Sequence, residues 1–144
     1  MKKQKLFLDG SVECDYYLIG ICSHLSDYRL IWSLNSLLGT KLSKRIELFN
    51  FYDFKKKKEK EFPIYYYEDV LDYSSYYVIK NNFGPNTLIT EAPNIDFLFF
   101  VQNHLNVKLY KELFEKIKKC KDVLGLFELS PQEFASTQFI DLNL

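Results

Sequence analysis

Four polar side chains, placed in two short segments, are of the types that acid–base or metal chemistry uses. His24 and Asp27 follow an apolar run, and Glu91 and Asp96 lie on either side of a turn-like Ala-Pro-Asn. A His–Asp pair can transfer protons, and two carboxylates brought together can divide acid and base roles or bind a divalent cation. The plainer interpretation is structural: Asp27 or a neighbouring serine caps a helix, and each carboxylate accepts backbone hydrogen bonds or pairs with a basic side chain.

The sequence contains no complete catalytic or metal-binding motif. Its three cysteines, Cys14, Cys22 and Cys120, lack the two-residue spacing of zinc and redox motifs. It also has no glycine-rich phosphate loop. We therefore expect no metal and no cofactor, and the sequence favours a non-enzymatic protein without excluding an enzyme.

The elements that position these residues are predicted from apolar periodicity. Residues 15–22 are typical of a strand, and a helix is expected over 30–38, ended by Gly39. A second helix is expected from Asn106 as N-cap to about Cys120, with an apolar face opposite a charged face. Other strand-like runs lie at 46–54, 62–67, 75–80, 86–90, 95–102 and 123–129. The Lys-Glu run 55–61 is expected to form an exposed hairpin tip.

This order of elements predicts an α+β fold. We expect one mixed, mostly antiparallel sheet with both helices packed on one face, as in a ferredoxin-like split βαβ plan elaborated with extra strands. The 144 residues suit a single domain, and the 47% hydrophobic content supports a substantial core. Residues 1–10 and 130–144 are expected to be peripheral arms of that domain.

The first predicted helix has more apolar surface than packing against one sheet requires. Besides an aliphatic stripe suited to the sheet, it carries Tyr28, Trp32 and Asn35 on another side, with Arg29 beside them. Either another part of this chain, such as 134–144, covers these aromatic residues, or they form a surface for a partner or for self-association. Tyr28, Arg29, Trp32 and Asn35 are therefore the candidate interaction surface.

The charge balance and the amino-terminal sequence bear on partners and location. Nineteen basic and nineteen acidic residues cancel, which argues against nucleic acid and against an anionic membrane as partners. The amino-terminal apolar run ends at Asp9, too early for a signal peptide, and no stretch approaches the ~18 apolar residues that span a bilayer. We expect a cytoplasmic protein. RNA binding through the aromatic strand 49–54, beside the lysine run, is the weakest hypothesis.

Residues 89–97, with the sequence ITEAPNIDF, resemble the motif of the bacterial IPExxxVDY family. Ile89, Glu91 and Asp96 match that motif, and residues 23–35 are similar to the region before and within the family's first helix. The other positions differ: Thr90 replaces proline, Ile95 replaces valine and Phe97 replaces tyrosine. The family is one of uncharacterised proteins, so the resemblance implies no catalytic residues. Because Phe97 has no hydroxyl group, the motif position fits packing better than catalysis.

Two functions of different classes follow from these patterns. The leading hypothesis is a non-enzymatic protein-interaction or regulatory domain, in which self-association through the first helix is one form of interaction. The alternative is a small-molecule or anion-binding domain, with or without catalysis, in which His24, Arg29, Glu91 and Asp96 converge on one pocket. The expected partners are accordingly another protein or a second copy of this chain, with a small-molecule ligand under the alternative.

Overall fold

The computed structural model describes residues 5–6, 12–13, 16–71, 73–102, 107–130 and 134. In chain order its elements are β1 (Lys5–Leu6), β2 (Val12–Glu13), β3 (Tyr17–Cys22), α1 (Asp27–Leu38), β4 (Ser43–Lys44), β5 (Phe49–Asp53), β6 (Lys58–Phe62), β7 (Ile64–Asp69), β8 (Ser74–Lys80), β9 (Asn82–Phe83), β10 (Asn86–Thr87), β11 (Phe97–Gln102), α2 (Val107–Lys118) and β12 (Gly125–Leu129). The arm expected at 130–144 and the N-cap expected at Asn106 fall almost entirely outside the described residues. Strand β1, in the arm expected at 1–10, pairs with β2, which lies just beyond that arm.

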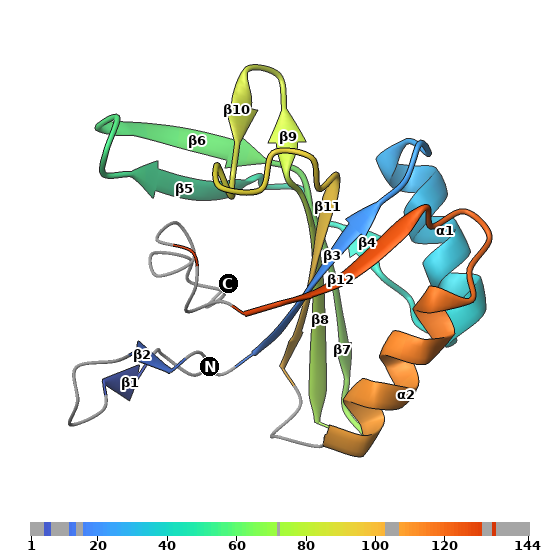
Figure 1. Ribbon diagram of the computed structural model, residues 1–144. Helices are drawn as coiled ribbons and strands as arrows, with labels where there is room; N and C mark the ends of the chain where they lie inside the picture. Colours follow the sequence, from blue (N-terminus) through green and yellow to red (C-terminus); the bar gives the residue numbers. More distant parts are fainter. Residues whose placement is uncertain are drawn as a thin grey trace.

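The architecture is α+β, with a six-stranded sheet in the order β12-β3-β11-β8-β7-β4. Both helices cover one face of this sheet, as predicted, and Figure 1 shows them side by side at the right. Every neighbouring strand pair in the described sheet is antiparallel. The expectation of a mixed sheet is therefore wrong, because the connection through α2 from β11 to β12 passes over β3, so the two parallel strands that it joins are not neighbours in the sheet.

Two hydrophobic cores lie on opposite faces of the sheet, and strand alternation assigns each side chain to one of them. On β11, Phe97 and Phe99 pack beneath the helices, whereas Leu98 and Phe100 pack on the other face with the β5–β6 hairpin. This double burial explains why the sequence of β11 is continuously apolar. Figure 1 shows the β5–β6 hairpin extending away from the helical side of the sheet.

The charged run at 55–61 is only partly a hairpin tip. Residues 58–62 form strand β6, and Lys60 is buried with its Nζ 2.9 Å from Oδ2 of Asp53. The same ammonium group donates a hydrogen bond to the carbonyl oxygen of Thr87 at 3.2 Å. The alternation of a strand thus turns one lysine of the run inward, which a simple count of charges does not reveal.

The two helices differ in how they are held. In α1, Leu30, Ile31 and Leu34 are buried against the sheet, and Gly39 ends the helix in the left-handed conformation, with φ 69°. Gly39 can adopt this conformation without steric cost because it has no Cβ. In α2, Tyr110 and Ile117 are buried, as the predicted apolar face requires, although Val107 is 49% exposed. No helix among the described residues is both long enough and apolar enough to cross a membrane.

Candidate functional site

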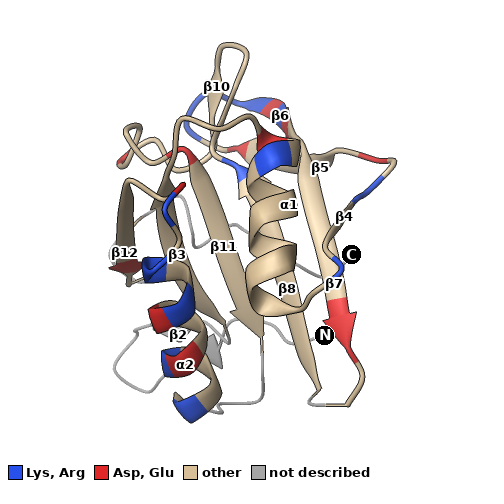
Figure 2. Ribbon diagram, turned by 90° about the vertical axis from the view of Figure 1, so that its right-hand side faces the viewer, with Lys and Arg blue, Asp and Glu red and all other residues tan. Residues whose placement is uncertain are grey.

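The aromatic residues of α1 are exposed. Tyr28 is 69% exposed and Trp32 is 70% exposed, and their four-residue spacing places them on one side of the helix. No described part of the chain covers them, and all but one residue of the segment 134–144, which was expected as the alternative cover, lies outside the described residues. Phe134, the one described residue of the segment proposed to cover them, packs against the core on the opposite face of the sheet. In Figure 2, most of α1 carries no charged side chains, whereas α2 is banded with basic and acidic residues.

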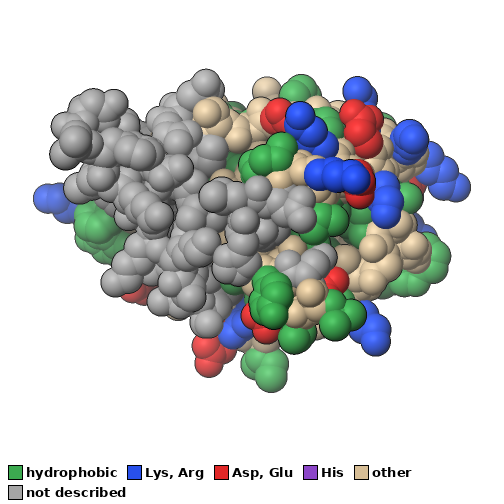
Figure 3. Space-filling view, turned by 90° about the horizontal axis from the view of Figure 1, so that it is seen from below, with side chains coloured by type: hydrophobic (Ala, Val, Ile, Leu, Met, Phe, Trp, Pro, Cys, Tyr) green, Lys and Arg blue, Asp and Glu red, His purple; other side chains and the backbone are tan. Residues whose placement is uncertain are grey.

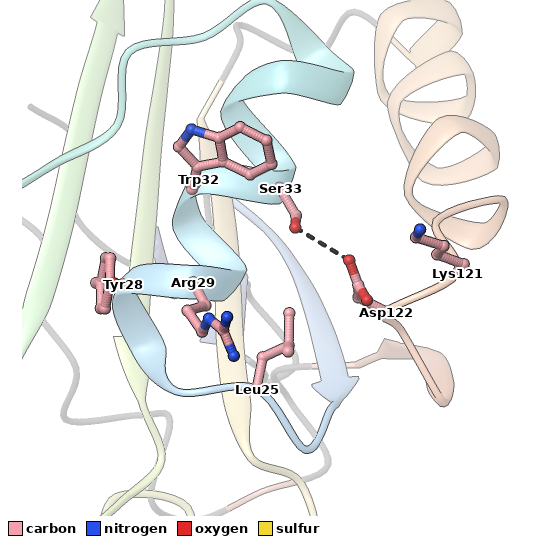
Figure 4. Close-up of a pocket in the computed structure, with 7 residues that line it drawn as sticks. All are labelled: Leu25, Tyr28, Arg29, Trp32, Ser33, Lys121 and Asp122. Carbon is pink, nitrogen blue, oxygen red and sulfur yellow. Dashed lines mark hydrogen bonds between the residues drawn. The ribbon is translucent and has the colours of Figure 1, made fainter.

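A groove of about 610 Å³, open to solvent, lies beside these aromatic residues. On one side α1 and the turn before it contribute side chains, and on the other side the segment after α2 does. Its lining residues are Leu25, Tyr28, Arg29, Trp32, Ser33, Lys121 and Asp122. We call this the α1 groove. Figure 4 shows Tyr28 and Trp32 on the outer side of the helix, with Lys121 and Asp122 across from Ser33.

Hydrogen bonds from two serines hold the far side of the α1 groove in place. The hydroxyl group of Ser33 donates to Oδ2 of Asp122 at 3.1 Å, the contact drawn as a dashed line in Figure 4. The hydroxyl group of Ser23 donates to the carbonyl oxygen of Asp122 at 2.7 Å. Ser33 lies on α1, and Ser23 is buried just before it. The two hydrogen bonds to Asp122 therefore fix the segment after α2 relative to α1.

Asn35, the fourth member of the candidate surface, has a structural role. Its side-chain oxygen accepts hydrogen bonds from the backbone N–H of Leu42 and the hydroxyl group of Thr40, at 2.8 and 2.7 Å. Its amide nitrogen donates to the carbonyl oxygen of Leu42 at 3.0 Å. Asn35 thus shapes the chain where it leaves α1, and the exposed surface is formed by Tyr28, Arg29 and Trp32.

Asp96 also has a structural role, because its carboxylate accepts a hydrogen bond from the backbone N–H of Ser23 at 2.9 Å. Its own backbone N–H donates to Ile21, and its carbonyl oxygen accepts from Asn81. Next to it, burial and then the Asp96 charge raise the pKa of the Cys22 thiol. Cys22 is therefore in the thiol form at neutral pH, which is not the nucleophilic form of a cysteine.

The side chain that organises residues 89–97 is Asn81, which no pattern in the sequence singles out. Asn81 is completely buried, its Oδ1 accepts from the backbone N–H of Ile89 at 2.8 Å, and its Nδ2 donates to the carbonyl oxygens of Ala92 and Ile95. A single asparagine thus satisfies three backbone groups of residues 89–95. The sequence signal for it was the Asn-Asn of the turn at 81–86, which is typical of a loop and gives no sign of burial.

The remaining candidate polar residues take different positions. Asp27 accepts a hydrogen bond from the Tyr65 hydroxyl group at 2.9 Å, and burial together with this contact raises the pKa of Tyr65, which stays protonated. His24 is exposed in the turn before α1, and Glu91 is exposed in the turn after β10. Ser26 occupies the N-cap position of α1, although its hydroxyl group makes no capping hydrogen bond.

These positions determine which chemistry the candidate polar residues can perform. Asp27 contacts β7, whereas Asp96 directly precedes β11, two strands away in the sheet. Among the described residues, no three His, Cys, Asp or Glu side chains are grouped so that they could hold a metal ion. Asp27 and Asp96 are thus held at separate places in the sheet, and each accepts a hydrogen bond from its own donor.

A second exposed aromatic pair lies on the β5–β6 hairpin. Tyr52 is 42% exposed and Phe54 is 58% exposed, and their rings meet edge to face with centroids 4.8 Å apart. Glu59, which faces Tyr52 across the hairpin, is also exposed. A carboxylate directly opposite Tyr52 repels a phosphate backbone, which weakens the case for RNA on this surface.

In the view from below in Figure 3, basic and acidic side chains are intermingled over the helical side.

Comparison of the chain with models of protein families, with curated proteins and with solved structures finds no match.

Proposed function

We propose that this protein is a non-enzymatic protein-interaction domain that binds its partner through the α1 groove. The observation that carries the proposal is the exposure of Trp32 and Tyr28, 70% and 69%, beside a groove of about 610 Å³. Leaving two large aromatic side chains in water on one helix face is typical of binding sites, where Trp, Tyr and Arg dominate the binding energy. Arg29 completes that set of residue types in the groove.

The rigidity of the groove supports the same function. Ser33 and Ser23 fix Asp122 from α1 and from the turn before it, so a partner would meet a surface that is already shaped. Such preorganisation lowers the entropic cost of association. Regulatory action through the bound partner, and self-association through the same surface, are both forms of this proposal.

The proposal is tested by capture of partners from native lysate with the wild-type protein, Trp32→Ala and Tyr52→Ala side by side. Tyr52→Ala is a matched control because it removes an exposed aromatic residue on the β5–β6 hairpin. We expect a partner that the wild type and Tyr52→Ala retain and that Trp32→Ala loses. Light scattering of the purified variants detects the case in which the partner is a second copy. Retention of every partner and every oligomer by Trp32→Ala would refute the proposal.

No specific observation favours the alternative of a small-molecule or anion site formed by His24, Arg29, Glu91 and Asp96. The Asp96 carboxylate accepts from Ser23, and Arg29 lies in the α1 groove with the aromatic residues. We retain the resemblance to the IPExxxVDY family and a cytoplasmic location as proposals. The same holds for the split βαβ plan, which is supported by β11 and β12 both running antiparallel to β3, the strand between them.

A further inference from the structure

The α1 groove presents hydrogen-bond donors and positive charge that the rest of the chain does not use. Among the described residues, Arg29 and Lys121 make no ion pair and no hydrogen bond, and both are exposed. The hydroxyl group of Tyr28 and the indole N–H of Trp32 are likewise without a partner there. A guanidinium, an ammonium and an indole N–H only donate. A partner that removes water from these groups must therefore supply acceptors to them.

The acidic groups of the same region are already engaged. The carboxylate of Asp122 accepts from Ser33 at 3.1 Å, and that of Asp27, in the first turn of α1, accepts from Tyr65 at 2.9 Å. The carboxylate of Asp96 accepts from the backbone N–H of Ser23. These carboxylates keep their negative charge, so the lining of the α1 groove carries the two cations Arg29 and Lys121 against the single carboxylate of Asp122, an excess of one positive charge.

We propose that the occupant of the α1 groove is an acidic segment of a partner protein, with an apolar side chain that packs against Trp32. The segment's carboxylates would meet Arg29 and Lys121. This inference rests on the proposed function and names the class of its partner. It follows from charge complementarity, because two cations without ion-pair partners and a row of donors flank one apolar surface, while Asp122, held by Ser33, is the one carboxylate among the groove's lining residues.

The same charges argue against two other occupants. A two-fold interface pairs a patch with itself, so a second copy placed symmetrically on this surface would offer from its own groove only one carboxylate, Asp122, against Arg29 and Lys121. Nucleic acid requires a continuous basic track along its phosphates. Here the whole chain has zero formal net charge, and the exposed acidic residues Glu112 and Glu115 lie on α2 beside its lysines.

The test is selection of peptides from a random-sequence display library on the immobilised wild-type protein, with Trp32→Ala as the counter-selection. The inference predicts that peptides depending on Trp32 are enriched in Asp and Glu around an aromatic or aliphatic residue. Peptides that depend on Trp32 but are neutral or basic would overturn the inference and leave the proposed function standing. A lack of any Trp32-dependent peptide would overturn both.

The enriched peptides are then titrated against the full chain, with Trp32 as the reporter. Trp32 is the single tryptophan of the chain, so its fluorescence reports the α1 groove alone. We expect Arg29→Glu and Lys121→Glu together to weaken binding roughly 3- to 30-fold, since each exposed ion pair contributes modestly. Raising the salt from about 0.05 to about 0.5 M should also weaken binding several-fold.

Two controls make the result specific. Lys111→Glu removes an exposed lysine of α2 outside the groove and changes the net charge in the same sense, so it should leave binding within about two-fold of the wild type. Single-stranded oligonucleotide and a second copy of the protein serve as competing probes. Equal affinity of Lys111→Glu and the groove variant, or stronger quenching of Trp32 by oligonucleotide than by the selected peptides, would overturn the inference. So would a dimer that buries Trp32.

Discussion

The backbone N–H of Ser23 donates a hydrogen bond to Oδ2 of Asp96 across 2.9 Å, and 73 residues of chain separate the two. This contact joins the IPExxxVDY-like segment to the turn that leads into α1. The hydroxyl group of Ser23 continues the connection to the carbonyl oxygen of Asp122 at the α1 groove. A carboxylate that is a candidate for acid–base chemistry in the sequence thus holds the turn that leads into α1, and its effect on the surface is indirect.

Asp96→Ala should lower the free energy of unfolding by about 1–3 kcal/mol, because it leaves the N–H of the buried Ser23 without an acceptor. Asp96→Asn should cost less, since an amide oxygen can replace the carboxylate oxygen. Urea denaturation followed by circular dichroism measures both. Glu91→Gln, on the exposed turn of the same motif, is the control and should stay within about 0.5 kcal/mol of the wild type. Equal stability of Asp96→Ala and the wild type would contradict the structural role.

Trp32→Ala should change the free energy of unfolding by less than about 0.5 kcal/mol, because most of this side chain is already in water. The matched variant is Leu34→Ala on the same helix, which empties a fully buried position and should cost about 2–5 kcal/mol. Denaturation followed by circular dichroism compares the two, since Trp32→Ala removes the fluorescent reporter. A large loss of stability in Trp32→Ala would mean that Trp32 packs in the core, and the interaction surface would lose its main support.

Lys60→Met should destabilise the β5–β6 hairpin and lower the free energy of unfolding by about 3 kcal/mol at neutral pH. The substitution removes a buried ammonium group that contacts both Asp53 and Thr87. Lys58→Met, an exposed position on the same strand, is the control and should be nearly neutral. Urea denaturation again gives the values, and equal effects of the two substitutions would show that the Lys60–Asp53 pair contributes nothing.

The same pair predicts a dependence on acid. The hydrogen bond from Lys60 is the main reason that the pKa of Asp53 lies below its ordinary value. A carboxylate with a lowered folded pKa stabilises the fold above its unfolded pKa of about 4 and loses that contribution as the pH falls further. Between pH 5 and pH 2, unfolding free energies should therefore decline less steeply in Lys60→Met than in the wild type. Parallel declines would contradict the coupling.

At alkaline pH the buried tyrosines should limit stability. Burial raises the pKa of Tyr77 to about 12, so the fold favours its neutral form. This contribution is complete below the unfolded pKa of about 10 and is lost as the pH rises from there towards 12. In that window, the unfolding free energy of Tyr77→Phe should fall less steeply with pH than that of the wild type. The difference in slope should not exceed the contribution of one titrating proton. Tyr28→Phe, at an exposed position, is the control, and identical pH profiles for all three proteins would refute the prediction.

The local elements were largely predictable from the sequence, because they depend on neighbours along the chain. The helix ended by Gly39, the apolar strand at 95–102 and the amphipathic helix after Asn106 all appear, with ends shifted by a few residues. The strand expected at 86–90 is much shorter, since only Asn86–Thr87 pair with β9. Side chains from that segment fill the core beneath the β5–β6 hairpin, as Leu88 and Ile89 do, and burial without strand pairing leaves the same apolar signal.

The candidate site was predictable only in part. The surplus apolar side of the first helix singled out Tyr28 and Trp32, because packing against one sheet needs only one apolar side, but it left open whether another part of the chain covers them. In the structure both side chains are exposed. The sequence could not show that Asn35 binds the chain after the helix, nor that Lys121 and Asp122 come to face that helix. Those contacts depend on how α2 returns beside α1, which periodicity does not specify.

The sequence by itself determined that the chain is an α+β protein with two amphipathic helices. It also determined that one of these helices has more apolar surface than packing against a single sheet requires. Hydrophobic period and turn residues act over a few positions, so they are readable in one dimension. Only the tertiary structure decided that the sheet is antiparallel throughout its described pairs, that Asp96 serves Ser23, and that Trp32 borders a groove with unpaired cations. These outcomes depend on which distant segments share the two faces of the sheet, and packing energy over the whole chain selects that arrangement.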